Sequence, residues 1–160
     1  MQTPTKQQVV ILGGGFAGFY AGLAFERMLR RRTDVEVTIV DRENFFLFTP
    51  MLHEVAAGDL TPQAIVCPLR KVFRKVNFFK GDIHSIDLTE QKVHLVYGES
   101  GEHEATLHYD HLLLGLGSVT NFFNLEGLRE SALTMKTLGD AIYLREHLIF
   151  RHIGFDRALE

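Results

Sequence analysis

The chain has 160 residues, of which 46% are hydrophobic and 23% charged, and its formal net charge at pH 7 is −3. These values are typical of one globular domain that can bury a core, and the negative balance disfavours nucleic acid as a partner. The single cysteine, Cys67, can build neither a disulfide framework nor a zinc site, which favours a reducing compartment such as the cytoplasm.

The first predicted elements are a buried strand and a helix separated by glycines. Residues 9–12 form an unbroken apolar run, as expected for a parallel strand that is covered on both faces. Apolar residues then recur with helical spacing and predict a helix over residues 16–32. The uncharged stretch 9–25 is slightly short for a membrane span, and its bunched glycines favour strand, turn and helix, so we expect no transmembrane segment. A second strand, residues 35–40, ends at Asp41 and completes a strand–helix–strand unit.

The next stretch is less regular. Residues 42–59 show no clear pattern and predict a loop rich in phenylalanine. Thr61 followed by Pro62 predicts the start of a helix, because a capping hydroxyl precedes a proline at the first helical position. Pro68 either interrupts that helix or begins a second one. Residues 77–79 predict a short strand.

Short alternating stretches follow and predict a small antiparallel meander. They cover residues 82–87, 92–97 and 106–109. Residues 111–114 predict another buried strand. Thr137, with Asp140 three residues later, predicts a variant of the capping box at the start of a helix that runs to about residue 152. The predicted fold class is therefore α/β, with a Rossmann-like parallel sheet and an inserted antiparallel β-meander.

The glycine-rich turn after the first strand is the strongest functional motif. Gly13-Gly14-Gly15-Phe16-Ala17-Gly18 fits G-x-G-x-x-G, and an acid, Asp41, ends the next strand. Gly13 permits a tight turn, Gly15 lets a pyrophosphate approach the backbone, and Gly18 lets the helix pack close to the sheet. The helix N-terminus offers N–H groups and a positive dipole end to phosphate. Asp41 would accept hydrogen bonds from both hydroxyls of an adenosine ribose, which disfavours a 2′-phosphate.

The order of elements resembles the FAD domain of the two-dinucleotide-binding flavoproteins, the superfamily that includes glutathione reductase. In both, the third strand leads into a meander rather than into further βα units. Within this superfamily the chain resembles the type II NADH dehydrogenases, also called NADH:quinone oxidoreductases. The matching segments are residues 9–18 (VVILGGGFAG), 48–58 (FTPMLHEVAAG), 109–118 (YDHLLLGLGS), 120–123 (TNFF) and 135–141 (MKTLGDA). The first segment is shared across the superfamily, whereas the second and third together are much more specific.

The resemblance implies FAD as the cofactor and NADH as a substrate of the full-length family. The implied cofactor-binding residues are Gly13, Gly14, Gly15, Phe16, Ala17 and Gly18 at the pyrophosphate, Asp41 with Arg42 at the ribose, Thr49, Pro50 and Met51 along the isoalloxazine, Ile83 at the adenine, and Gly115 and Gly117 closing over the cofactor. No catalytic side chain and no metal ligand is nominated, because the flavin itself performs the hydride and electron chemistry.

Two positions depart from the usual pattern of the family. The strand end reads Gly115-Leu116-Gly117 in place of Ala-Thr-Gly, which removes a local hydroxyl hydrogen bond. Gly22 replaces the commoner alanine, at a modest cost to the helix. Gly139-Asp140 resembles the second FAD motif, in which an aspartate holds the ribitol. Here the pair opens a helix, so capping is the expected role.

Other kinds of site are disfavoured. Disulfide reductases of the superfamily need two redox cysteines, and Cys67 alone is expected to be a buried small hydrophobe. The histidines, among them His103, His108 and His111, lack carboxylate or cysteine companions at ligand spacing, so solvated histidines are expected rather than a metal site. The phenylalanines of residues 45–48 have only scattered basic neighbours, which favours a core or flavin-edge role over a nucleic-acid platform.

Family members are considerably longer, and no second glycine-rich βαβ unit for NADH follows in this chain. We therefore expect residues 1–160 to be the FAD-binding half of an NADH:quinone oxidoreductase. NADH and a quinone would bind through the absent half, a homodimer is an allowed assembly, and full-length members lie peripherally on the membrane. Two alternatives stay open: a non-catalytic dinucleotide-binding domain, or another flavoprotein of the superfamily such as a sulfide:quinone oxidoreductase.

Overall fold

The computed structural model describes residues 6–156, with side-chain surroundings through residue 149. The chain forms two compact units. The first unit comprises residues 1–46 and 67–117, and the second comprises residues 47–66 and 118–160.

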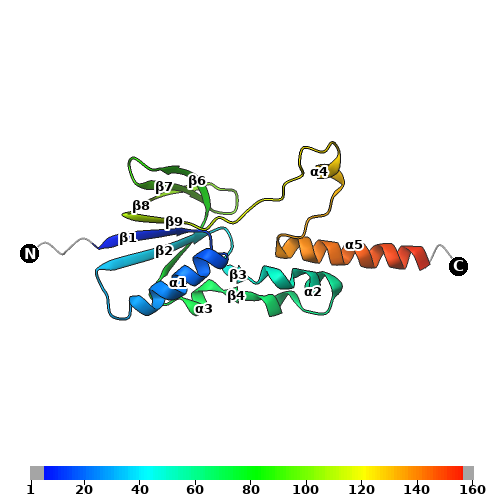
Figure 1. The fold of residues 1–160 in the computed structure, drawn as a ribbon, viewed down its shortest axis with the longest axis horizontal. Coiled ribbons are helices and arrows are strands. Elements are labelled where there is room, and N and C mark those ends of the chain that lie inside the picture. Colours follow the sequence, from blue (N-terminus) through cyan, green and yellow to red (C-terminus); the bar gives the residue numbers. More distant parts are fainter. Residues whose placement is uncertain (1–5, 157–160) are drawn as a thin grey trace, which may run out of the picture. The chain divides into compact units, whose positions relative to one another are not determined.

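The first unit contains a four-stranded parallel sheet with the strand order β5-β2-β1-β9 (Figure 1). Its strands are β1 (Gln7–Leu12), β2 (Val35–Asp41), β5 (Asn77–Lys80) and β9 (His111–Leu114). These bounds confirm the four strands predicted from the sequence. Helix α1 (Phe16–Met28) connects β1 to β2 and ends at Met28 rather than at residue 32.

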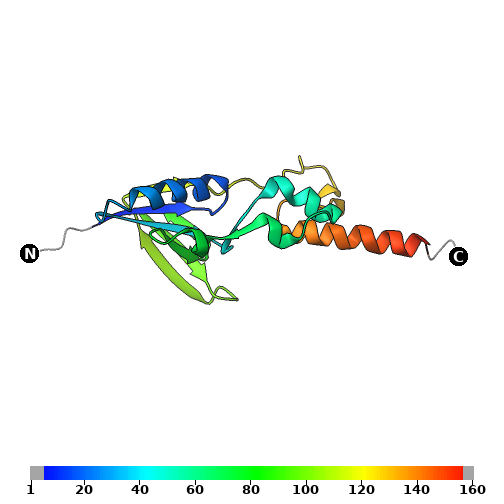
Figure 2. The same ribbon diagram turned by 90° about the horizontal axis from the view of Figure 1, so that it is seen from below.

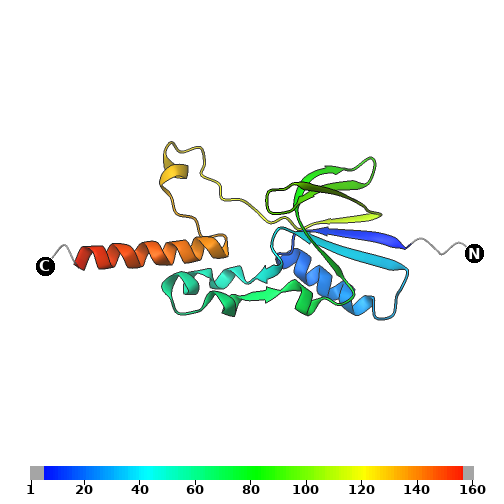
Figure 3. The ribbon, with the colours of Figure 1, turned by 180° about the vertical axis from the view of Figure 1, so that it is seen from behind.

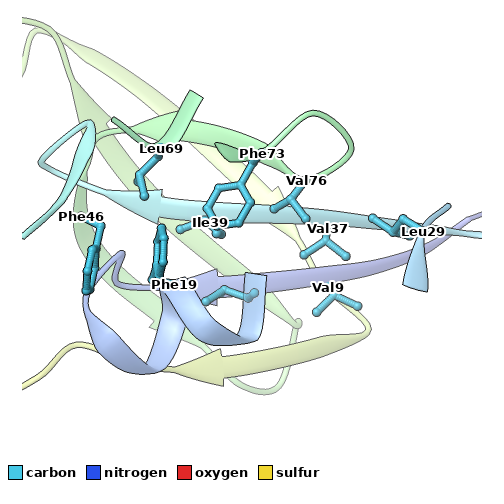
Figure 4. Packing of buried hydrophobic residues seen from close by; sticks show 10 residues of the cluster. Val9, Phe19, Leu29, Val37, Ile39, Phe46, Leu69, Phe73 and Val76 are labelled. Atoms are coloured by element: carbon cyan, nitrogen blue, oxygen red, sulfur yellow. The ribbon is translucent and has the colours of Figure 1, made fainter. Parts of the chain in front are cut away.

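The two faces of this sheet bury alternate residues of the same strands. The face toward α1 buries Val9, Ile11, Val37 and Ile39, which pack with Phe19 (Figure 4). The opposite face buries Val10, Leu12 and Val40, which pack with Val93 and Leu95 of the meander. Figure 2 shows α1 on one side of the sheet and the meander on the other. The strands read as unbroken apolar runs because both of their faces are covered.

The meander is a three-stranded antiparallel sheet with the order β6-β7-β8. Its strands are β6 (Asp82–Asp87), β7 (Lys92–Tyr97) and β8 (His103–His108). The first two have the bounds expected from the sequence, and the third begins at His103 rather than at residue 106. A parallel sheet with an inserted antiparallel meander confirms the predicted fold class.

The prediction of a loop over residues 42–59 is wrong. Strand β3 (Phe45–Leu47) pairs with β4 (Val66–Pro68) in a two-stranded sheet, and the chain passes between the two units within these strands. The 3₁₀ turn η1 (Thr49–Met51) then leads into α2 (Leu52–Ala57). With 6 residues, α2 is too short for a helical period to recur in its sequence.

The helix start predicted at Thr61 is also only partly formed. Thr61 precedes a 3₁₀ turn, η2 (Pro62–Ile65), and its side chain makes no capping hydrogen bond. Pro68 precedes α3 (Leu69–Val72), a helix of 4 residues. Both segments lack the length that a cooperative α-helix requires.

The second unit pairs two helices. α5 (Leu138–Asp156) lies beside α2 (Figure 3), and their shared core contains Leu52, Val55, Ala56, Ile65 and Ala141. α4 (Leu128–Ser131) is a short helix between β9 and α5 that the sequence did not predict. The predicted helix after Thr137 is confirmed and continues to Asp156.

Candidate nucleotide-binding site

The turn between β1 and α1 needs glycine at its first and last motif positions. Gly13 has a φ of +101°, and a Cβ built there would overlap the carbonyl oxygen of Gly115. Its N–H donates to the carbonyl oxygen of Val40 at 2.8 Å, which ties the turn to β2. A Cβ at Gly18 would overlap the carbonyl oxygen of Gly13, so the helix approaches the turn as closely as the motif predicts.

Gly15 lies in open space. A Cβ built at Gly15 would meet no atom within 4 Å, in contrast to Gly13 and Gly18. Glycine is therefore not required there by packing inside this chain. An open backbone at this position fits the close approach of a pyrophosphate, which a side chain would obstruct.

The first turn of α1 contributes no acidic side chain that would repel an anion. Gly15 occupies the N-cap position, no side chain caps the helix, and the first turn contains no acidic residue. The partial positive charge of the helix N-terminus therefore faces no carboxylate within its own first turn. Phe16 and Ala17 begin this turn, and the Phe16 ring packs on the Phe46 ring with centroids 5.1 Å apart.

Asp41 at the end of β2 is directed at the turn. Its Oδ2 accepts a hydrogen bond from the backbone N–H of Gly14, and its Oδ1 accepts one from the N–H of Glu43 at 2.8 Å. Each carboxylate oxygen has a second lone pair, so these bonds leave acceptor capacity for a sugar hydroxyl. The sequence predicted the ribose role of Asp41 but missed the bond to Gly14, since motif spacing does not reveal which N–H a carboxylate meets.

The end of β9 lies next to the same turn. The N–H of Gly115 donates to the carbonyl oxygen of Leu12 at 2.7 Å. A Cβ at Gly115 would lie 3.3 Å from the backbone nitrogen of Gly18 and 3.4 Å from the Cβ of Ala17. The neighbouring parallel strands β1 and β9 both end in this region. In open α/β sheets, ligands bind at the carboxyl ends of the strands. Gly117, two residues later, has a φ of +75°, and a Cβ built there would meet no atom within 4 Å.

Two other residues of the first unit have defined surroundings. Arg42 is exposed, and its Nε lies 3.6 Å from Oδ1 of Asp82, also exposed. Ile83 is half-buried in β6 and pairs with Leu95 of β7, next to an irregularity in the register. Neither arrangement tests the adenine and ribose contacts that the resemblance implies, so those roles stay predictions.

Three of the implied flavin contacts belong to the second unit. Thr49, Pro50 and Met51 form η1, and all are exposed. Their implied place along the isoalloxazine stays a prediction. Gly22, by contrast, has a packing reason that the sequence did not show, because a Cβ there would lie 2.7 Å from Cδ1 of Ile39 and 2.8 Å from Cζ of Phe73.

Asp140 caps α5, as predicted. Its Oδ2 accepts from the N–H of Thr137 at 2.9 Å, and its own N–H donates to Oγ1 of Thr137 at 3.1 Å. Burial would raise the pKa of Asp140, but bonds from the N–H groups of Lys136 and Thr137 and from threonine hydroxyls hold it below its ordinary value. The carboxylate is thus ionised and engaged with its own helix at neutral pH.

The histidines of the meander show ordinary surroundings. Nδ1 of His94 lies 3.1 Å from Oγ1 of Thr106, and the His103 ring packs near the Tyr97 ring. Within residues 6–156 no group of three or more histidine, cysteine, aspartate or glutamate side chains could hold a metal ion. No helix in the described part of the chain has the length and hydropathy to cross a membrane.

The chain matches one protein family over most of its length. Residues 7–153 match the family described as pyridine nucleotide-disulphide oxidoreductase. This match includes the glycine turn, Asp41, the meander and the end of β9.

Individual relatives have related names. An external alternative NAD(P)H-ubiquinone oxidoreductase B4, mitochondrial, from Arabidopsis thaliana is 34% identical over 150 residues, covering 90% of this chain and 25% of that protein. The type II NADH:quinone oxidoreductase Ndh of Mycobacterium tuberculosis is 32% identical over 151 residues, covering 92% of this chain and 31% of that protein. The solved structure of NDH2 from Plasmodium falciparum in complex with NADH has a TM-score of 0.78 at 26% identity, covering 88% of this chain and 28% of that one. The chain thus spans 25% to 31% of the length of these proteins.

Proposed function

Because the chain belongs to the pyridine nucleotide-disulphide oxidoreductase family, we propose that it binds FAD and forms the FAD-binding part of an NADH:quinone oxidoreductase. The observation that carries this proposal is the pairing of an open backbone at Gly15 with the Asp41 carboxylate directed at the same turn. A pyrophosphate needs the first feature, and the adjoining ribose needs the second.

The described residues fit this cofactor. Gly13 to Gly18 would hold the pyrophosphate through main-chain N–H groups and the helix dipole, while Asp41 would hold the ribose. The family resemblance adds Arg42 beside the ribose, Ile83 at the adenine, Thr49 to Met51 along the isoalloxazine, and Gly115 and Gly117 over the cofactor. When bound, FAD supplies hydride and electron transfer, so the residues of the chain are needed for binding and orientation rather than as nucleophiles or acids.

The donor and acceptor belong to the whole protein. The Arabidopsis relative is named for NAD(P)H and ubiquinone, and the Mycobacterium relative for NADH and quinone. The Plasmodium NDH2 structure is a complex with NADH. On this basis we assign NADH as the donor and a quinone as the acceptor. A peripheral place on a membrane and a homodimer belong to the same proposal, and the dimer is tested by light scattering of the purified protein.

Titration with FAD tests the central step. We expect the purified chain to retain flavin, seen in its visible spectrum, and to quench flavin fluorescence on titration. Gly15→Ala fills the open space at the turn and should weaken FAD binding by about tenfold or more, equivalent to about 1.4 kcal/mol, without changing the unfolding midpoint.

A matched substitution at another glycine is the control. A Cβ at Gly139, in the first turn of α5, would meet its nearest neighbour, Oγ1 of Thr137, at an ordinary 3.7 Å. Gly139→Ala should therefore leave FAD affinity unchanged. If neither the chain nor the control retains flavin, the proposal is wrong and only a generic α/β chain is left.

The electron donor is tested separately with the full-length protein. Anaerobic addition of NADH should bleach the flavin absorbance, and quinone should restore it. Bleaching by sulfide and not by NADH would instead support the sulfide:quinone oxidoreductase alternative. Retention of flavin with no response to either donor would support the non-catalytic alternative.

A further inference from the structure

The main chain that follows β9 is held by few contacts of its own. Residues 115–117 read Gly-Leu-Gly, and the proposed function places both glycines over FAD. The N–H of Gly115 still bonds to the carbonyl oxygen of Leu12, but Leu116 is 57% exposed, and a Cβ at Gly117 would meet no atom. Packing therefore restrains residues 116 and 117 little, although glycine loses more conformational freedom on ordering than any other residue.

Ser118 is the first residue after β9 whose side chain can form a hydrogen bond. Its Oγ accepts a hydrogen bond from Nζ of Lys136 at 2.6 Å. Within the described part of the chain, this is the one hydrogen bond that residues 116–120 make. The donor is an ammonium group, and charged donors form stronger hydrogen bonds than neutral ones. Lys136 is therefore the polar anchor of the segment that follows β9.

Lys136 is itself held at the start of α5. Its N–H donates to Oδ2 of Asp140 at 2.8 Å, and this bond does not involve the hydroxyl of Thr137. Because its main chain is fixed in this way, the Lys136 side chain can hold Ser118 in place instead of moving with it. The two residues of the pair are 18 positions apart in the sequence, so no local pattern predicts their contact.

The same bond closes a long loop. Residues 118–136 follow β9, include α4 and lead to the start of α5 (Figure 1). Val119, the residue after Ser118, is 90% exposed, so apolar packing does not anchor the beginning of this loop. Bringing the two ends of a flexible loop together costs conformational entropy, which a bond between its ends offsets. The bond from Lys136 to Ser118 joins these ends directly after the segment proposed to cover FAD.

We propose that Lys136 is a positioning residue for the cofactor. By holding Ser118, it orders the preceding residues Leu116 and Gly117, so that this segment closes over FAD. This role rests on the proposed function, which supplies FAD as the ligand of the segment. A segment that is ordered before binding loses less conformational entropy when the cofactor binds, and the cofactor is therefore bound more tightly. Lys136 acts through Ser118 and not through the chemistry of hydride transfer.

NMR relaxation of the flavin-free 160-residue chain tests the ordering step. Lys136→Met removes the ammonium group and keeps a long unbranched side chain. We expect the backbone order parameters of Gly117 and Ser118 to fall from about 0.85, which is typical of rigid backbone, to below about 0.6 in this variant. Unchanged order parameters would overturn the positioning role. No flavin is present, so this result does not depend on the proposed function.

Titration with FAD, followed by fluorescence quenching, tests the binding step. We expect Lys136→Met and Ser118→Ala each to weaken FAD binding by about fivefold, and the double variant to bind no more weakly than either single one. Lys136→Arg keeps a charged donor and should restore the affinity to within about twofold of the parent chain. If Lys136→Met weakens binding and Ser118→Ala does not, Lys136 acts on the cofactor directly and the positioning role is wrong.

Lys71→Met is the matched control, because it removes the same charge at an exposed site on α3, where Lys71 makes no hydrogen bond or ion pair with the described residues. It should change neither the order parameters nor the FAD affinity. An equal loss of affinity in Lys71→Met would show that net charge controls binding.

The outcomes for Lys136 and for the proposed function are distinguishable. Thermal melts by circular dichroism verify that each variant folds. If the parent chain retains FAD and Lys136→Met binds it equally well, the role of Lys136 is wrong and the proposed function stands. If the parent chain retains no FAD, the proposed function fails, and the role of Lys136 toward the cofactor fails with it.

Discussion

The two long helices of this protein begin in opposite ways. At the start of α5, Thr137 and Asp140 cap each other's backbone N–H groups at 2.9 and 3.1 Å. At the start of α1, the N-cap is Gly15, no side chain caps the helix, and the first turn contains no acid. The side chains at the start of α5 therefore satisfy backbone N–H groups of that helix, whereas no side chain does so at the start of α1.

The capped start of α5 stabilises its own helix, whereas the uncapped start of α1 can receive an anion. A side-chain cap contributes about 1 kcal/mol to a helix, so stability alone would favour the α5 arrangement at both sites. At α1 the acid comes from β2 instead, and Asp41 holds Gly14 of the turn. The turn is thus fixed in shape while Gly15 stays open.

The largest effect is expected where the turn itself is broken. Gly18→Ala places a Cβ against the backbone carbonyl of Gly13, and backbone cannot move aside as a side chain can. We expect a loss of about 3 kcal/mol in the free energy of unfolding, measured by urea denaturation. Gly15→Ala, where a Cβ has free space, is the control and should unfold like the parent chain. Equal stability of the two variants would show that α1 does not approach the turn this closely.

Removal of the Asp41 carboxylate tests whether it holds the turn. Asp41→Ala leaves the buried N–H of Gly14 without its acceptor, at a cost of about 2 kcal/mol in unfolding free energy. FAD affinity should fall as well, if the carboxylate binds the ribose. Asp41→Asn keeps an acceptor oxygen and should recover part of the stability. A variant that loses FAD binding but keeps full stability would show that Asp41 binds the ligand and does not stabilise the turn.

Loss of the α5 cap should have the converse effect. Thr137→Ala removes the hydroxyl that accepts from the N–H of Asp140, and should lower the unfolding free energy by about 1 kcal/mol. FAD affinity should not change, because this cap serves only its own helix. A change in flavin fluorescence quenching with Thr137→Ala would remove the contrast between the two helix starts.

The smallest effect is a pH dependence of the same cap. The pKa of Asp140 is held below its ordinary 3.8, so its contribution to stability is present above that pH and disappears as the pH falls through the folded-state pKa. The difference in unfolding free energy between the parent chain and Asp140→Asn should therefore be constant near neutral pH and shrink on acidification. A difference that grows toward low pH would contradict the assigned direction.

Segments that carry their own periodic pattern could be predicted from the sequence. β1, β2 and β9 read as strands because both faces are buried, and β7 reads as a strand because alternate side chains, Val93 and Leu95, face the core. In β6 the core-facing residues Ile83 and Ile86 are three positions apart, because the register is irregular between them. α2 and the β3–β4 pair could not be predicted, because each is too short for its periodic pattern to recur often enough to be recognised. Their positions depend on packing against Ile65, Ala141 and other residues elsewhere in the chain.

The sequence by itself determined the glycine turn, the acid at position 41 and the capping pair of α5, since each is a local pattern with its own chemistry. Only the tertiary structure decided that Asp41 holds Gly14, that Gly115 lies against Gly13, and that Glu26 accepts hydrogen bonds from the backbone of Lys75 and Val76. These contacts join residues far apart in the chain. They arise because the buried strands and α1 pack in one arrangement, and no local pattern of residues specifies which distant groups that arrangement brings together.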